Sequence, residues 1–290
     1  MGDPRLALLT RSDIVALMEA ERIEPRRSMG QNFVVDPNTI RRIVRLSGAG
    51  PGDRVIEVGP GLGSLTLGLL EAGCDVVAVE KDHALARALL ARLGDAVGER
   101  LEVIGGDALD LDWEPILDGQ RRTLVANLPY NLATTIVIDI LDRVPLIDHL
   151  LVMVQREVAD RMCAAPGSKV HGLPTIRIAR HATARRVGLV GPDVFWPRPR
   201  VESALVEFRR YDPSSFDVVD ESLFRELVAA GFGQRRKTLR RSLSARWPTE
   251  LVDQALFVSG INASERAERL GIEQWVELTA ALSAALDGES

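Results

Sequence analysis

The chain has 290 residues, 46% of them hydrophobic and 27% charged, which is enough apolar material for one large or two ordinary domains. The net charge of −5, taken alone, argues mildly against a polyanionic partner. Two cysteines, Cys74 and Cys163, exclude a disulfide framework, and the four histidines lack the spacing of a metal site. Because the sequence shows neither a signal peptide nor a long apolar run, we expect a cytoplasmic protein without a bound metal.

Residues 1–27 predict an N-terminal helical segment. Ser12 is expected to cap a helix whose apolar face includes Ile14 and Met18. Pro25 is expected to end that helix, because proline lacks the backbone N–H that a helix interior requires.

The middle of the chain, residues 28–211, alternates between short β-branched runs and segments with helical spacing. This alternation indicates βαβ units and an α/β fold with a mostly parallel, Rossmann-like sheet and helices on both faces. A further strand pair is expected around 176–190 and 203–209. The predicted strands are 54–58, 75–79, 101–104, 123–126 and 150–154, and helices are predicted at 62–72 and 84–93.

Residues 212–290 show helical patterns only, which predicts a second, small all-helical domain. Its last helix carries a stripe that includes Ile272, Trp275 and Leu282. Charge is also uneven along the chain. The tracts 161–192 and 234–246 each contain six basic side chains and no acidic one. Such tracts favour a phosphate-backbone partner, although a charge run is also typical of an ordinary solvated surface.

A glycine-rich segment follows the first predicted strand, where Gly59, Gly61 and Gly63 stand two residues apart. Glycine permits positive φ and lets a ligand approach the backbone closely. Glu80 and Asp107 stand at the ends of the next two predicted strands, placed to bind the ribose and the adenine of an adenosine cofactor. Each feature has a structural alternative, because glycines also serve turns and acids also cap helices.

Both NAD and S-adenosylmethionine fit such a pocket. The G-x-G-x-G spacing departs from the dinucleotide-binding G-x-G-x-x-G, and Glu57 stands two residues before the loop. These features favour S-adenosylmethionine, a preference that rests partly on a resemblance to class I methyltransferases. A dehydrogenase is disfavoured further because the sequence shows no evident acid–base constellation.

The segment Asn127-Leu128-Pro129-Tyr130 follows the fourth predicted strand and suits chemistry on an adenine amine. That nitrogen is a poor nucleophile, because its lone pair is delocalised into the ring. The Asn127 side-chain oxygen and the Leu128 carbonyl are expected to accept its N–H groups. Pro129 would aim the carbonyl, and Tyr130 offers a face for an extruded base. This would be catalysis by orientation; the alternative is a simple turn with a core tyrosine.

Over nearly its whole length the chain resembles the KsgA-type rRNA adenine N6,N6-dimethyltransferases. Several ordered motifs carry this resemblance, which makes it far more specific than the glycine loop alone. The matching segments are 28–36 (SMGQNFVVD), 57–63 (EVGPGLG), 79–80 (VE), 106–108 (GDA), 127–130 (NLPY), 153–161 (MVQREVADR), 166–169 (PGSK), 194–203 (VFWPRPRVES), 234–240 (QRRKTLR) and 266–268 (RAE).

The resemblance implies a class I S-adenosylmethionine-dependent methyltransferase core and a helical C-terminal domain that contributes to rRNA binding. It also implies an enzyme that dimethylates two adjacent adenosines in the 3′-terminal hairpin loop of small-subunit (16S) rRNA, on an immature 30S particle, late in ribosome biogenesis. We expect a monomer. Val34 replaces the leucine more usual at its position. The implied cofactor contacts are Asn32, Val34, Gly59, Gly61, Glu80, Asp107 and Asn127. We expect rRNA contacts at Arg198, Arg200, Arg235, Arg236, Lys237 and Arg240; the alternative for Arg235, Arg236 and Lys237 is that they hold the two domains together.

Two related functions stay open at this point. The macrolide-resistance methyltransferases modify large-subunit rRNA; Asn-Leu-Pro-Tyr and Gln-Arg-Arg-Lys-Thr in this chain favour the small-subunit type. An assembly factor whose methylation is secondary or lost is the other alternative. The intact glycine loop, Glu80, Asp107 and 127–130 favour a retained catalyst.

Overall fold

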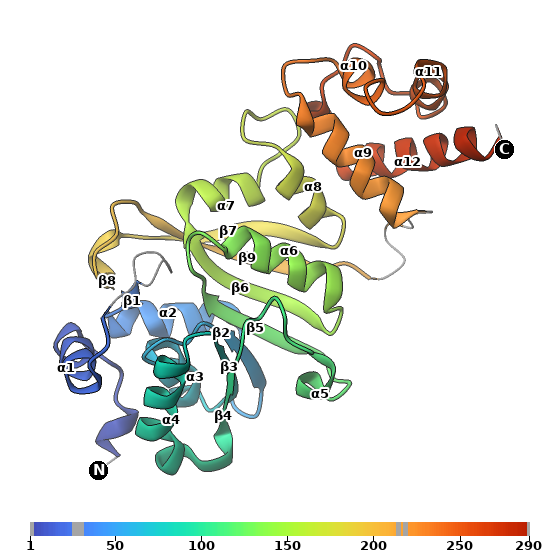
Figure 1. The fold of residues 1–290 in the computed structure, drawn as a ribbon. Coiled ribbons are helices and arrows are strands. Elements are labelled where there is room, and N and C mark those ends of the chain that lie inside the picture. Colours follow the sequence, from blue (N-terminus) through green and yellow to red (C-terminus); the bar gives the residue numbers. More distant parts are fainter. Residues whose placement is uncertain (1–2, 25–31, 213–215, 217–219, 289–290) are drawn as a thin grey trace. The chain divides into compact units, whose positions relative to one another are not determined.

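The computed structural model describes residues 3–24, 32–212, 216 and 220–288. Pro25 and residues 28–31, which carry sequence predictions, lie outside these ranges. The contacts divide the chain into two compact units (Figure 1): Met1–Ala159 with Ala184–Arg209, and Asp160–Thr183 with Arg210–Ser290. None of the described helices has the length and apolarity needed to cross a membrane.

A seven-stranded sheet organises the first unit, in the order β4-β3-β2-β5-β6-β9-β7. The pairs from β4 to β6 are parallel, and β6 pairs antiparallel with β9. The predicted mostly parallel α/β sheet is therefore confirmed. The strands are β2 (Arg54–Val58), β3 (Asp75–Glu80), β4 (Leu101–Gly105), β5 (Arg122–Asn127), β6 (Ile147–Gln155), β7 (Ala182–Val190) and β9 (Ser203–Arg210).

The strand order reverses at β2, and this reversal locates the site. β2 pairs with β3 on one side and with β5 on the other, so Val55 is aligned with both Val76 and Thr123. The connections from these two neighbours leave in opposite directions, which opens a crevice at the carboxyl ends of the strands. A second, two-stranded sheet pairs β1 (Phe33–Val34) with β8 (Phe195–Trp196).

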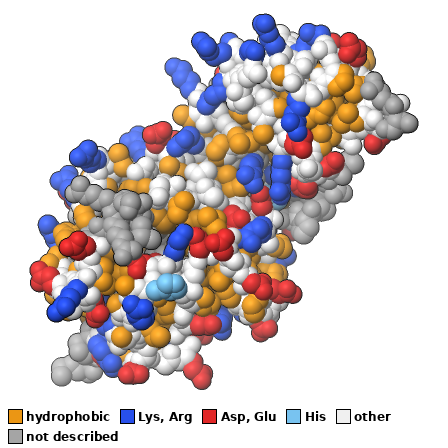
Figure 2. All heavy atoms as spheres, viewed as in Figure 1, with side chains coloured by type: hydrophobic (Ala, Val, Ile, Leu, Met, Phe, Trp, Pro, Cys, Tyr) orange, Lys and Arg blue, Asp and Glu red, His pale blue; other side chains and the backbone are white. Residues whose placement is uncertain are grey.

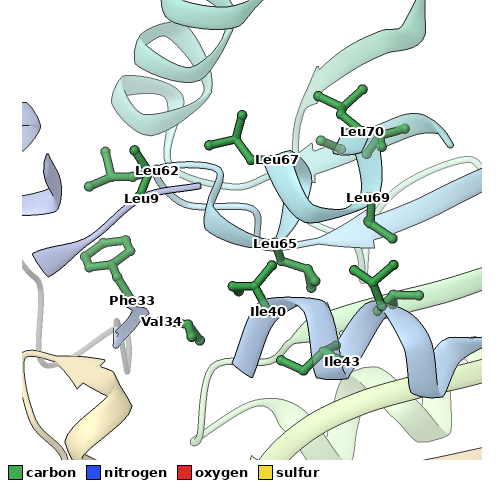
Figure 3. Close-up of a cluster of buried hydrophobic side chains, with 14 of the residues drawn as sticks. Leu9, Phe33, Val34, Ile40, Ile43, Leu62, Leu65, Leu67, Leu69 and Leu70 are labelled. Carbon is green, nitrogen blue, oxygen red and sulfur yellow. The ribbon is translucent and has the colours of Figure 1, made fainter. Parts of the chain in front are cut away.

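Helices pack on the sheet through a large apolar cluster (Figure 3), to which α2, α3 and α4 contribute. On β6, Leu151 and Met153 join this cluster, whereas the alternate residues Leu150 and Val152 are buried outside it. Because neighbouring strand residues point to opposite faces, both faces of the sheet are covered. The helices are α1 (Arg11–Glu21), α2 (Pro37–Ser47), α3 (Ser64–Glu71), α4 (His83–Val97), α5 (Glu114–Leu117), α6 (Ala133–Arg143) and α7 (Arg156–Met162), with 3₁₀ turns η1 (Pro4–Leu6), η3 (Gly98–Arg100) and η4 (Pro192–Val194).

Two details of the predicted elements are wrong. The N-cap of α1 is Thr10 rather than Ser12: its backbone N–H and hydroxyl both donate to the Asp13 carboxylate, at 2.8 and 2.6 Å. Residues 173–179 form a helix, α8 (Leu173–Ala179), rather than the start of a strand. Ile176 is buried in a helical core, so packing decides the conformation of that stretch.

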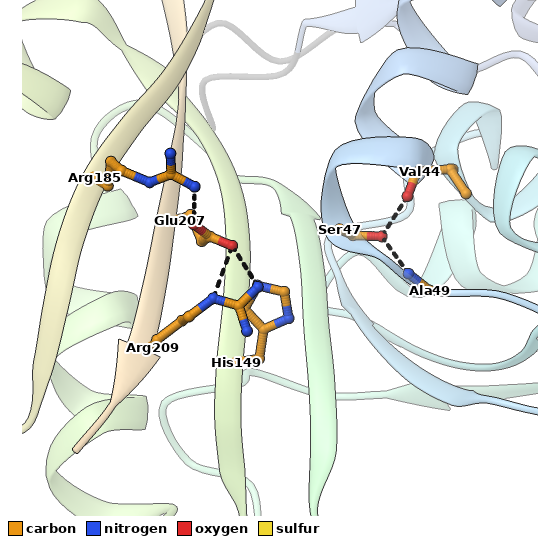
Figure 4. Close-up of polar contacts among 7 residues, drawn as sticks. All are labelled: Val44, Ser47, Ala49, His149, Arg185, Glu207 and Arg209. Atoms are coloured by element: carbon orange, nitrogen blue, oxygen red, sulfur yellow. Dashed lines mark hydrogen bonds and ion pairs between the residues drawn. The ribbon is translucent and has the colours of Figure 1, made fainter.

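A buried carboxylate joins the strands at the far side of the sheet (Figure 4). Glu207 on β9 accepts hydrogen bonds from Arg185 on β7 at 2.8 Å and from Arg209, and it lies 3.2 Å from His149 on β6. Burial acts to raise the Glu207 pKa, but the two guanidinium groups outweigh it and lower that pKa. These partners satisfy the carboxylate, which indicates a structural role for the cluster.

The second unit is a helical bundle built around Trp275, whose side chain is fully buried. Gly231 of α9 (Glu221–Gly233) lets the Trp275 ring approach the helix closely, since a Cβ at this position would lie 2.4 Å from Trp275 Cη2. Residues 160–183 make their contacts mainly with this unit. The predicted domain of residues 212–290 therefore omits a segment that packs with the helical unit. Besides α8, its helices are α9 (Glu221–Gly233), α10 (Leu239–Leu243), α11 (Thr249–Val258) and α12 (Ile272–Asp287), with the turn η5 (Ala267–Arg269).

Candidate active site

A cavity of about 310 Å³ lies at the carboxyl ends of the parallel strands, where the strand order reverses. Its walls come from β1, the loop after β2, and the ends of β3, β4 and β5. Open α/β sheets bind their ligands at this position. Every residue predicted to bind cofactor or to act in catalysis lines it: Asn32, Val34, Gly59, Gly61, Glu80, Asp107, Asn127, Leu128, Pro129 and Tyr130.

The glycine loop forms one wall of this cavity. Gly61 has a φ of 58°, and a Cβ at this position would lie 2.8 Å from Phe33 Cε1, so a larger residue is both strained and crowded. A Cβ at Gly59 would meet no described atom within 4 Å. The backbone there is open, and a ligand can approach it closely.

Glu80 ties the loop to the end of β3. Its buried carboxylate accepts the Gly61 N–H at 3.0 Å and the Asp82 N–H at 2.9 Å. Burial raises the pKa of Glu80. The cap of α4 is Asp82, which accepts the Ala84 N–H. Glu80 is therefore not the helix cap, and its carboxylate lies at the cavity with capacity to accept further hydrogen bonds.

A second acid, Glu57 on β2, lies deeper in the same wall. Its side chain is 1% exposed, and complete burial raises its pKa to about 8. Thr66 Oγ1 donates a hydrogen bond to its carboxyl group at 2.7 Å. Because desolvation disfavours the charged form, Glu57 carries a proton at neutral pH and presents a neutral carboxyl group to the cavity.

Asp107 at the end of β4 has a partner that sequence reasoning missed. Lys81, the residue after Glu80, forms an ion pair with Asp107 Oδ2, while the Leu109 N–H donates to Oδ1. Partial burial acts to raise the Asp107 pKa, but these hydrogen bonds outweigh it and lower that pKa. The only feature of the sequence that points to Lys81 is its position directly after Glu80, the acidic residue expected to bind the ribose.

The segment 127–130 continues β5 into the cavity. Asn127 Nδ2 donates to the Asn32 backbone carbonyl at 2.9 Å, which leaves the side-chain oxygen as the acceptor. Leu128 is held by its N–H, which donates to the Met153 carbonyl. The Tyr130 hydroxyl lies 2.7 Å from Ser203 Oγ, and burial raises the pKa of Tyr130. These contacts fix both ends of the segment.

The predicted rRNA-binding residues are divided between the two units. Arg198 and Arg200 lie in the first unit after β8, where Arg198 pairs with Asp193 at 3.2 Å. The others lie in the helical unit, over which Figure 2 shows several Lys and Arg side chains at the surface. Arg236 and Lys237 there are exposed.

Two of the basic residues in the helical unit have internal partners. Arg235 donates to the Lys169 and His171 carbonyls at 2.9 and 3.2 Å and pairs with Glu268. Arg240 forms a two-point pair with Asp253. These contacts assign Arg235 in particular to holding segments of its own unit together.

Comparison with known proteins agrees with this geometry. A profile described as ribosomal RNA adenine dimethylase matches residues 23–283. The ribosomal RNA small subunit methyltransferase A of Bifidobacterium longum subsp. infantis is 44% identical, over 97% of this chain and 96% of the relative.

Two solved structures have similar folds. A 23S rRNA methyltransferase, ErmE, is 25% identical, with a TM-score of 0.65 over 87% of this chain and 99% of that one. A dimethyladenosine transferase from Plasmodium falciparum, 20% identical, has a TM-score of 0.74 over 87% of this chain and 98% of that one, and supports the fold. The chain belongs to the ribosomal RNA adenine dimethylase family, and the protein is an S-adenosylmethionine-dependent methyltransferase.

Proposed function

We propose that the protein dimethylates the N6 atoms of two adjacent adenosines in the 3′-terminal hairpin loop of small-subunit rRNA. It acts as a monomer in the cytoplasm, on an immature 30S particle late in assembly. The observation that carries the adenine-methylating part of this proposal is the Asn127–Asn32 hydrogen bond, which engages the amide nitrogen and leaves the Asn127 oxygen as an acceptor at a cavity that Glu80 and Asp107 also line.

The residues of the cavity fit S-adenosylmethionine. Glu80 would accept the ribose hydroxyls, and Asp107 would accept the adenine amine. The open backbone at Gly59 leaves room for a ligand beside the glycine loop. Asn32, directly before β1, and Val34 in β1 line the cavity on another side. The neutral Glu57 carboxyl group adds no second full negative charge beside Glu80. When bound, the cofactor supplies an electrophilic methyl group on a sulfonium.

The segment 127–130 would prepare the target amine. Asn127 Oδ1 and the Leu128 carbonyl accept its two N–H groups, which favours a pyramidal nitrogen with an available lone pair. Tyr130, anchored at its hydroxyl by Ser203, supports the extruded base by stacking. Asn127 is neutral, so the contribution is orientation and hydrogen bonding rather than strong general-base catalysis.

The small subunit is favoured over the large subunit as the substrate. The relative named for small-subunit rRNA is 44% identical over nearly the whole of both chains, whereas the 23S rRNA methyltransferase is 25% identical. The proposed roles of the cavity residues concern the cofactor and the target base only, so the cavity alone does not select one subunit. Contacts outside the cavity, where Arg200, Arg236 and Lys237 are exposed, would select the particle.

Methyl transfer to defined particles tests the proposal. The purified protein and methyl-labelled S-adenosylmethionine are incubated with 30S particles lacking the modification or with 50S particles, and modified bases are mapped. We expect label on two adjacent adenosines of small-subunit RNA. Label on large-subunit RNA would support the macrolide-resistance type instead. Binding to 30S particles without methyl incorporation would support a pure assembly factor.

A further inference from the structure

The segment 194–203 connects two parts of the first unit that carry the proposed cofactor cavity. Near its start, Phe195 in β8 pairs with Val34 in β1, a strand that lines the cavity (Figure 1). At its end, Ser203 begins β9 and is aligned with Gln155 at the end of β6. Strand pairing therefore holds the segment at both ends, and Ser203 has a defined position in the sheet.

Ser203 is a polar side chain at the start of an apolar strand. It is fully buried, and the three residues that follow it, 204–206, are apolar and equally buried. Its Oγ lies 2.7 Å from the hydroxyl oxygen of Tyr130, and either group can donate the hydrogen bond. Tyr130 lines the cavity, whereas Ser203 is not among the lining residues. The direct route from the serine to the cavity is therefore this hydrogen bond.

The strand β6 aligns both partners of the hydrogen bond. Leu128, two residues before Tyr130, donates its backbone N–H to the Met153 carbonyl at 3.1 Å. Ser203 is aligned with Gln155, two residues further along the same strand. The chain before the tyrosine and the serine that meets its hydroxyl are thus placed by one strand. With its backbone and its hydroxyl both held, the ring has a single orientation in the cavity wall.

We propose that Ser203 is a positioning residue for methyl transfer, because it fixes the Tyr130 ring in the orientation that receives the target adenine. This proposal rests on the function proposed above, in which the extruded base stacks on that ring. A stacked base is held by the plane of the ring beneath it. A ring without its anchor would turn, and the amine would be aligned less often with the methyl group of the cofactor.

Ser203→Ala and Tyr130→Phe each remove one half of the hydrogen bond and keep the ring. Each should lower kcat on 30S particles about tenfold, because the base is oriented less well, and leave the calorimetric affinity for S-adenosylmethionine unchanged. The double variant should be no slower than either single variant, since both changes remove the same interaction. Unchanged turnover in both single variants, or effects that multiply in the double variant, would overturn the proposal.

Ser47→Ala is the matched control for the loss of a buried serine hydroxyl in the same unit. Ser47 is buried, its Oγ donates to the Val44 carbonyl at 2.7 Å, and it does not line the cavity. We expect this variant to keep native kcat. A loss of kcat in Ser47→Ala equal to that in Ser203→Ala would assign both effects to stability and overturn the positioning role.

A spectroscopic measurement without RNA separates this proposal from the proposed function. The chain has two tyrosines, Tyr130 and Tyr211, so labelling with meta-fluorotyrosine gives one fluorine NMR signal for each, and Tyr211→Phe assigns them. Ser203→Ala should shift and broaden the Tyr130 signal and leave the Tyr211 signal in place. An unchanged Tyr130 signal, with normal methylation by the native protein, would reject the positioning role alone. No methylation by the native protein would reject the proposed function.

Discussion

The Asn127 side chain donates its Nδ2–H to the Asn32 backbone carbonyl at 2.9 Å, across 95 residues of sequence. The side-chain amide of Asn127 has an NH₂ donor and an oxygen acceptor, and this hydrogen bond determines which of the two is available in the cavity. With the NH₂ group engaged, the oxygen remains as the acceptor. The contact joins the end of β5 to the residue before β1, two segments that both line the proposed cofactor cavity. The Asn127 side chain is therefore oriented before any substrate binds.

Asn127→Ala should remove most turnover and leave cofactor binding largely intact. The lost acceptor would cost on the order of a hundredfold in kcat, as the loss of one oriented hydrogen-bonding group does in other active sites. Methyl transfer to 30S particles and calorimetric S-adenosylmethionine affinity are measured together. Asn127→Asp keeps an acceptor but loses the donor to Asn32, so it should also be slow. Near-normal methylation by the alanine variant would reject the mechanism.

Lys81→Met should make cofactor binding sensitive to acid. In the native protein, hydrogen bonds from Lys81 and the Leu109 N–H outweigh burial and keep the Asp107 pKa low. Without the ammonium group this lowering is reduced, so the Asp107 pKa rises relative to the native protein and Asp107 is protonated at a higher pH. The affinity deficit of the variant for S-adenosylmethionine should therefore grow as the pH is lowered. Lys81→Arg retains the charge and serves as control; a deficit that does not depend on pH would contradict this role.

The residues at the ends of the strands could be predicted from the sequence, whereas contacts between residues far apart in the sequence could not. Glycines, Glu80 and Asp107 follow β-branched runs, and parallel strands bring their carboxyl ends to one edge, so local patterns sufficed. The pairing of Lys81 with Asp107 depends on the order of β3 and β4 in the sheet, which no local pattern encodes. The strand predicted around 176–190 begins only at Ala182, because Ile176 is buried among helices and belongs to α8.

Lys237→Glu and Arg235→Glu should have different effects, although the two residues are close in sequence. Lys237 is exposed, so its reversal should weaken binding to 30S particles and lower the magnitude of the salt slope by about one or more. Arg235 donates to two backbone carbonyls, and its reversal should lower the melting temperature. Affinity and its salt dependence are measured beside thermal unfolding. If Lys237→Glu leaves the affinity for 30S particles and its salt dependence unchanged, the proposed contact between Lys237 and rRNA is contradicted.

Gly231→Ala should destabilise the helical unit, although alanine is the better helix former. The new Cβ would lie 2.4 Å from Cη2 of Trp275, a rigid and fully buried ring. Overpacking of this kind costs about 1–3 kcal/mol, against a gain of at most about 1 kcal/mol in helix propensity. Gly233→Ala, in the same helix with no described atom within 4 Å, should be neutral or stabilising. Equal unfolding free energies for the two variants would contradict the packing role of Gly231.

Glu57 should make the stability of the apo protein fall as the pH rises. Burial raises its folded pKa from 4.5 to about 8. Below pH 4.5 the group is protonated in both folded and unfolded states, and its contribution is complete. Between pH 4.5 and 8 only the unfolded state releases the proton, so the free energy of unfolding declines by about 1.4 kcal/mol per pH unit from this group.

Glu57→Gln isolates that contribution, because glutamine is neutral and its side-chain oxygen can still accept the hydrogen bond of Thr66. We expect the variant to gain stability relative to the native protein as the pH rises from 5 to about 8, in urea denaturation without cofactor. The difference should level off above the folded pKa, where both states of the native protein are ionised. A constant difference across this range would mean that Glu57 is already charged in the fold, with Glu80 beside it, and would contradict a neutral carboxyl group in the cavity.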